Sequence, residues 1–152
     1  MKFEELDPHF KNALIDGMQT KAPYWSLLGM ELVDVKKGWA KVRLPFDHKL
    51  IHPLGIAHGG AIFSPADSAV AMALIGLVER DETFTTVEMK LNYLMPFKEG
   101  EIIAEATIVY KGSTTAIGDV EVRNAERTLI AKGLATYMIL NNNRKERAES
   151  QG

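Results

Sequence analysis

The 152-residue chain suits one globular domain, because a single core at this length buries about two-thirds of the unfolded surface. A net charge of −2, with both signs scattered along the chain, gives no electrostatic footprint for nucleic acid or an anionic membrane. The absence of cysteine excludes disulfides, thiolate metal sites and a cysteine nucleophile, and together with the lack of a secretory-type apolar start it leads us to expect a cytoplasmic protein.

The segment before residue 59 predicts two short helices, a hairpin and a loop. Asp7-Pro8 is typical of a helix N-terminus, and apolar residues follow it at four-residue spacing. Two apolar stretches on either side of a Lys-Lys-Gly turn predict the hairpin. The expected bounds are 7–19 and 22–29 for the helices, 30–35 and 39–44 for the hairpin strands, and 45–58 for the loop.

A segment from about 59 to 79 is apolar around its whole helical circumference, which predicts a buried helix with one isolated charge, Asp67. Two interpretations of this segment stay open. If Ser64, Pro65 and Asp67 form a capping box, the helix begins at residue 64, and propensity alone favours this start. If the helix begins at Gly59, Asp67 lies two turns inside it and Pro65 causes a local kink. Asp67 is then a functional candidate, because an ionised side chain on a buried element is costly.

Four strands are predicted after this helix. Apolar and polar side chains alternate along the first of them, which is typical of a half-exposed antiparallel strand. The expected bounds are 84–95, 101–111, 114–123 and 128–140. Residues 141–152 contain one apolar residue, Ala148, and predict a flexible tail after a single domain of residues 1–140.

These elements predict an α+β fold in which a curved antiparallel β-sheet wraps a long central helix, with a short helix at the N-terminus. One twisted sheet cannot shield a helix that is apolar on every side without leaving one face bare. A second copy of the chain that completes the sheet edges would cover that face. The sequence therefore predicts a homodimer.

A glycine pair leads directly into the predicted helix. Gly59 and Gly60 follow His58 and permit a ligand to approach backbone amides that point outward at a helix N-terminus. Such amides can hold a developing oxyanion. Glycine pairs are common in turns, so this motif by itself is weak evidence.

A wider set of motif residues runs from the loop before this helix to the end of the next strand. It reads His52-x-x-Gly55-x-x-His58-Gly59-Gly60-x6-Asp67, followed by Thr86-Val87-Glu88-Met89 and Tyr93-x-x-Pro96. The pattern resembles the hotdog-fold thioesterases of the phenylacetate-degradation (PaaI-like) type, and the resemblance covers about residues 25–140. It implies a homodimer with active sites at the interface, often paired into a homotetramer. It also implies hydrolysis of an acyl-CoA thioester to a free acid and CoA, with coenzyme A present only as part of the substrate and no separate cofactor.

The resemblance assigns catalytic roles to five residues. Asp67 occupies the position of a general base or nucleophile, and the amide of Gly59 polarises the thioester carbonyl. The hydroxyl of Thr86 helps to place water. For His58 the residues themselves leave two roles open: it either orders the turn by hydrogen bonds or carries a proton. His52 stands where relatives commonly carry asparagine. Its imidazole either donates to the carbonyl, with a pH dependence that an amide lacks, or faces solvent as an ordinary loop histidine.

The strand position of Thr86 raises a further alternative. In a regular strand Thr86 points to the same side as Glu88 and Lys90, opposite to the apolar residues. It therefore faces either the site or solvent. Thr85 takes its place if the register slips by one residue.

Substrate contacts are expected at two places. Gly60, Phe63 and Tyr93 are expected to contact the substrate near the helix, although the acyl group itself is not specified by these residues. Lys111 with Gly112 at a turn, or Arg144 and Lys145 in the tail, would supply positive charge for the phosphates of CoA.

Three other functions fit parts of the pattern. A hydratase or dehydratase on the same fold also uses a histidine and a carboxylate. A non-catalytic acyl-CoA-binding module would result if His52 had disabled the site. A metal site could draw donors from His48, His52, His58 and Asp67, but their spacing is irregular and no metal is expected.

Overall fold

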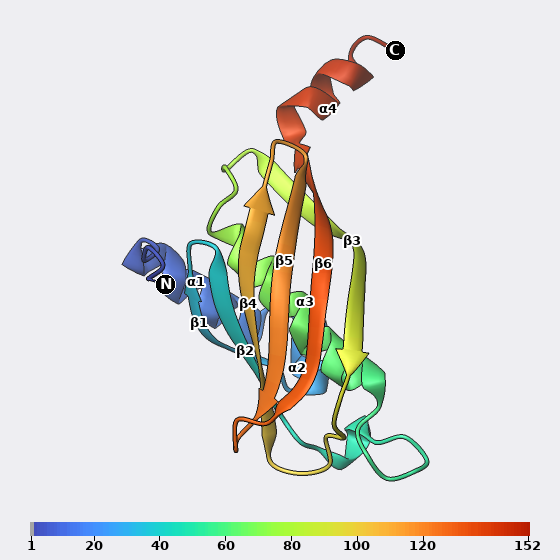
Figure 1. The fold of residues 1–152 in the computed structure, drawn as a ribbon. Helices are drawn as coiled ribbons and strands as arrows, with labels where there is room; N and C mark the ends of the chain where they lie inside the picture. Colours follow the sequence, from blue (N-terminus) through green and yellow to red (C-terminus); the bar gives the residue numbers. More distant parts are fainter. Residues whose placement is uncertain (1) are drawn as a thin grey trace.

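One long helix lies against a six-stranded sheet in the computed structural model, with two short helices before them and one after (Figure 1). The structure describes residues 2–152, without the side chains of residues 144–147. The elements in chain order are α1 (Pro8–Thr20), α2 (Pro23–Leu28), β1 (Glu31–Lys36), β2 (Trp39–Pro45), the 3-10 turn η1 (His48–Leu50), α3 (Gly59–Ile75), β3 (Glu82–Tyr93), β4 (Glu101–Lys111), β5 (Thr115–Asn124), β6 (Leu129–Asn141) and α4 (Asn142–Glu149).

The sheet is antiparallel throughout, in the order β1-β2-β4-β5-β6-β3, so β1 and β3 are its edge strands. Helix α3 packs against β2, β4 and β5, and the core lies between helix and sheet. Small side chains on the sheet-facing side of α3, such as Ala66, Ala69 and Ala73, are completely buried and let the helix approach closely. This is the predicted α+β hotdog arrangement, and the helix and strand bounds before and after α3 agree with the prediction to within two residues.

Helix α3 begins at Gly59, so the alternative start at residue 64 is wrong. His58 is the N-cap, and its Nδ1 accepts a hydrogen bond from the N–H of Gly60 at 2.8 Å. A Cβ on Gly60 would lie 3.0 Å from that Nδ1, so glycine there leaves room for the cap. Ser64 does not cap, because its hydroxyl donates to the carbonyl of Gly60 at 2.9 Å. Pro65 lies inside the helix, where it removes one backbone donor.

The same helix ends at Ile75, four residues before its predicted end. The turn of the β1–β2 hairpin reaches the end of α3, and the N–H of Gly38 donates to the carbonyl of Ala73 at 3.1 Å. That carbonyl would otherwise accept from Leu77 in a continued helix. The sequence does not reveal this contact, because it joins segments far apart in the chain.

The C-terminal segment, which the sequence predicts as a flexible tail, is mostly helical. Strand β6 continues to Asn141, which pairs with Glu82 of β3, and α4 follows at once. The side-chain Oδ1 of Asn141 accepts from the N–H of Asn143 at 3.1 Å at the start of α4. The residues after it are mostly Arg, Lys, Glu and Ala, which have a high intrinsic helix propensity. Figure 1 shows α4 extending beyond the end of the sheet.

Gly118 on β5 marks the closest approach between sheet and helix. A Cβ there would overlap Cγ1 of Val70 on α3, so we expect Gly118→Ala to destabilise the protein by about 1–3 kcal/mol through overpacking. Urea unfolding followed by circular dichroism measures the change. Gly17→Ala on α1 is the control, because a Cβ there meets no atom within 4 Å and should stabilise the helix by about 0.5–1 kcal/mol. Equal stability of Gly118→Ala and the native protein would contradict the packing described here.

Candidate active site

Asp67 lies in the middle of α3, where its side chain meets β3 and β6. The hydroxyl of Thr86 on β3 contacts Oδ1 of Asp67 at 3.0 Å and Oδ2 at 3.3 Å. The hydroxyl of Tyr137 on β6 donates to the same Oδ1 at 2.5 Å and lies 2.8 Å from the backbone carbonyl of Asp67. Thr86 and Tyr137 are partners in the β3–β6 register. The carboxylate is therefore held by two hydroxyls from neighbouring strands, while the residue stays partly exposed.

A β-bulge brings Thr86 to this position. The register of β3 against β6 shifts between Thr86 and Glu88, so Val87 is the extra residue and is 55% exposed. Before the bulge Thr86 faces α3, and after it Met89 packs against the core. In a regular strand without the bulge, Thr86 would point to the same side as Glu88. Thr85 and Thr86 are both exposed on this protomer, but the hydrogen bonds to Asp67 come from Thr86, so the register does not slip to Thr85.

Tyr137 is a site residue that the sequence reasoning missed. Alternation with Ala135 and Ile139 marks it as inward-facing, but a tyrosine on that side of a strand is ordinarily a core residue. That Tyr137 lies beside Thr86 follows only from the pairing register of β3 and β6. Burial, with the hydrogen bond to Asp67 as the next cause, raises the pKa of the Tyr137 hydroxyl well above its usual value. The hydroxyl is therefore a neutral donor at ordinary pH.

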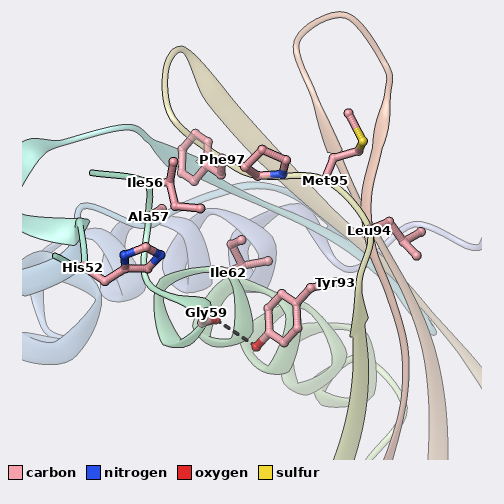
Figure 2. A pocket seen from close by; sticks show the side chains of 10 residues that line it. His52, Ile56, Ala57, Gly59, Ile62, Tyr93, Leu94, Met95 and Phe97 are labelled. Carbon is pink, nitrogen blue, oxygen red and sulfur yellow. Dashed lines mark hydrogen bonds between the residues drawn. The ribbon is translucent and has the colours of Figure 1, made fainter. Parts of the chain in front are cut away.

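A second group of residues surrounds the N-terminus of α3 (Figure 2). Gly59 is the first residue of the helix, and the hydroxyl of Tyr93 donates to its carbonyl at 2.9 Å. Burial raises the pKa of Tyr93, which keeps this donor protonated. Within residues 2–152 the N–H of Gly59 has no acceptor, as expected for the first turn of a helix. That N–H is thus available to a ligand.

His52 lies on the opposite side of Gly59 from Tyr93 in Figure 2. Its Nδ1 accepts from the N–H of Leu54 at 3.0 Å, so the neutral ring carries its proton on Nε2. His52, Gly59 and Tyr93 line one pocket of about 440 Å³. Its other lining residues are mostly apolar: Ile56, Ala57, Ile62, Leu94, Met95, Pro96 and Phe97.

The two groups do not meet within one chain. Gly59 and Asp67 are eight residues apart on α3, which at the rise of a helix separates them by about 12 Å. An oxyanion donor and a base that act on one carbonyl must each come within about 3 Å of the reacting atoms. One protomer therefore holds both halves of the predicted site without assembling them.

The other predicted contact residues do not line this pocket. Phe63 is on α3, half-buried and outside the pocket lining. Lys111 ends β4, three strands from Thr86 in the same row of the sheet, a separation of about 14 Å. Gly112 follows it in the β4–β5 turn, and this turn lies at the opposite end of the sheet from the start of α3 (Figure 1). The side chains of Arg144 and Lys145 lie outside the described residues.

The described residues contain neither a metal-binding cluster nor a membrane-spanning helix. No group of three or more His, Cys, Asp or Glu side chains among them is arranged to hold a metal ion. No helix among them is both long enough and apolar enough to cross a membrane.

Comparison with known proteins gives consistent matches in sequence. The profile of the thioesterase superfamily matches residues 54–131. A protein from Archaeoglobus fulgidus is 32% identical over 127 residues, which are 83% of this chain and 80% of that protein. A medium/long-chain acyl-CoA thioesterase from Escherichia coli is 28% identical, and the aligned part covers 77% of this chain and 85% of that enzyme.

Solved structures match across most of the chain. A conserved protein from Pseudomonas aeruginosa is 33% identical, with a TM-score of 0.73 over 80% of this chain and 97% of that one. The PaaI protein of the Escherichia coli phenylacetic acid degradation operon has a TM-score of 0.76 over 83% and 90% of the two chains. At 21% identity, that second match bears on the fold alone.

Proposed function

Because the chain belongs to the thioesterase superfamily, we propose that it is an acyl-CoA thioesterase, which hydrolyses a thioester to a free carboxylic acid and coenzyme A. One observation carries this proposal. A carboxylate on the central helix, Asp67, is held by two hydroxyls from neighbouring strands and remains partly exposed. Such a group is ready to activate water or to attack a carbonyl.

The chemistry needs few protein groups, because a thioester carbonyl is already electrophilic. As a general base, Asp67 takes a proton from water while the water oxygen bonds to the carbonyl carbon. The C–S bond then breaks, and the CoA thiolate receives the proton. As a nucleophile, Asp67 forms a mixed anhydride as the thiolate leaves, and water cleaves the anhydride. In both routes the N–H of Gly59 donates to the oxyanion.

We place the complete site between two protomers. A stripe of α3 stays at least partly exposed on this protomer, and it includes Asp67. Its members follow helical spacing: Gly60, Phe63, Ser64, Asp67, Ser68, Ala71 and Ile75. Strand β3 is an edge with unpaired backbone groups. A second copy that continues the sheet at β3 would cover this stripe and bring its own Gly59 to Asp67.

Two-fold symmetry then produces two equal sites for each dimer. Pairing of two such dimers into a tetramer remains a prediction. A cytoplasmic location, which fits the absence of cysteine, is part of the same proposal.

The remaining residues take supporting roles in this proposal. His52 donates from Nε2 to the thioester carbonyl beside Gly59, and its tautomer is already set by the Leu54 N–H. His58 acts through structure, as the N-cap that orders the Gly59-Gly60 turn. Lys111 and Gly112 remain predicted contacts for the CoA phosphates.

Thiol release from a panel of short, medium, long and aryl-acetyl CoA thioesters tests this function. We expect CoA thiol to appear with the free acid in equal amounts for at least one substrate. A change in enoyl absorbance without thiol release would indicate a hydratase instead. Binding of acyl-CoA without turnover of any substrate would contradict the proposal and point to a binding module.

A further inference from the structure

We propose that Tyr137 is a positioning residue for the reaction: its hydroxyl fixes one oxygen of the Asp67 carboxylate, so that the other oxygen is the one that reacts. The inference rests on the proposed thioesterase function and adds a residue to it. Of the two carboxylate oxygens, Oδ2 is then the one that meets water or the thioester.

The two hydroxyls at Asp67 converge on the same oxygen. Tyr137 and Thr86 reach Oδ1 at 2.5 Å and 3.0 Å, whereas Oδ2 has only the 3.3 Å contact with Thr86. A threonine hydroxyl has a single proton, and its shorter contact is with Oδ1. The lone pairs of Oδ2 are therefore left for a proton or a carbon atom. Among the described residues no ion pair involves Asp67, so these hydroxyls are its only side-chain partners there.

Tyr137 also restrains the torsion of the Asp67 side chain. Its hydroxyl lies between Oδ1 and the backbone carbonyl of Asp67, at 2.5 Å and 2.8 Å. One group that contacts both the side chain and the main chain of a residue opposes rotation about the bonds between them. Thr86 makes no such main-chain contact, so the two hydroxyls are not equivalent.

Tyr137 is itself rigidly held. Only 2% of Tyr137 is exposed. Its neighbours in the sheet are Ala116 on β5 and Thr86 on β3. The ring meets Phe84 edge-on, with centroids 5.9 Å apart and planes at 64°. Burial and this ring contact restrict the movement of the hydroxyl. The raised pKa of Tyr137 means that it keeps its proton, so it orients the carboxylate and does not act as an acid.

Tyr137→Phe tests this role, because it removes the hydroxyl and keeps the ring. We expect kcat to fall about tenfold with KM unchanged. The ionised carboxylate loses a donor, so the acid limb of the pH–rate profile should move to higher pH. Tyr24→Phe is the matched control, because the Tyr24 hydroxyl also bonds to α3, at Ser64 Oγ, 2.6 Å away. The control should keep both kcat and the acid limb.

A second measurement does not depend on the folding of that variant. The chain has four tyrosines, and 3-fluorotyrosine can replace them biosynthetically. Each of the variants Tyr24→Phe, Tyr93→Phe and Tyr110→Phe loses one fluorine resonance, which assigns that resonance. The remaining resonance belongs to Tyr137. We expect this resonance to titrate at the pH of the acid limb and to lose the titration in Asp67→Asn.

Two results would overturn the inference. One is a folded Tyr137→Phe protein whose kcat and acid limb match those of the native protein. The other is a Tyr137 resonance that stays constant across the acid limb. An inactive native protein would instead contradict the proposed function, and the resonance would still report whether Tyr137 responds to Asp67.

Discussion

An Asp67→Asn variant is expected to lose thioester hydrolysis by a factor of about 10²–10⁴ in kcat, the usual contribution of a positioned acid or base. An amide can neither take a proton from water nor attack the carbonyl carbon. The side chain keeps its shape, and its remaining oxygen can still accept from Thr86 and Tyr137. Thiol release measures the loss, and urea unfolding checks that the fold persists.

Asp16→Asn is the control for this prediction. Asp16 is exposed on α1, so its neutralisation makes a similar change in net charge without touching α3. We expect its kcat to match that of the native protein. A folded Asp67→Asn protein within about threefold of native activity would show that Asp67 is structural, since removal of a catalytic base costs far more.

The second large effect is expected at Gly59, where proline can remove one N–H with little change to the backbone. Proline is favoured at the first position of a helix, which Gly59 occupies. His58 has φ −60° and ψ 142°, the extended conformation that a residue before proline prefers. We expect Gly59→Pro to lower kcat by about 10²–10³, the usual effect of losing one oxyanion donor. Thiol release from the best substrate measures it.

Gly59→Ala separates the lost N–H from the added carbon. A Cβ at this position would lie 3.3 Å from the ring of Tyr93, so both variants require a small shift of that side chain. Only the proline variant lacks the donor. We expect the alanine variant to keep most of the native kcat. An equal loss in both variants would assign the effect to the contact with Tyr93 and would contradict the oxyanion role.

The sequence predicts the elements well because their signals are local. Apolar periodicity, the Asp7-Pro8 helix start and the hairpin turn all act within a few residues. The start of α3 is harder, since Ser64-Pro65-Ala66-Asp67 satisfies the local rules for a cap. The imidazole of His58 caps an earlier start instead, and the Ser64 hydroxyl turns back to a carbonyl in the preceding turn. Here two local patterns compete, and local propensity alone favours the wrong one.

The site was less predictable because it depends on long-range register. The bulge at Val87 changes which side chains of β3 face α3, and simple alternation does not reveal it. Tyr137 becomes a partner of Asp67 only when β6 pairs with β3 in this register. Asp67 and Gly59 were identified by their spacing in the sequence. Their separation of about 12 Å along one helix is a consequence of that spacing, and it is the reason that we propose a site between two protomers.

The assembled site is tested most directly by mixing two inactive protomers. Co-expression of Asp67→Asn and Gly59→Pro chains gives mixed dimers, in which one site has the native Asp67 of one chain and the native Gly59 of the other. Random pairing in a two-fold dimer should restore about a quarter of native activity, far above either variant alone. Activity no greater than the average of the two variants, in mixed dimers confirmed by mass spectrometry, would contradict a site shared between protomers.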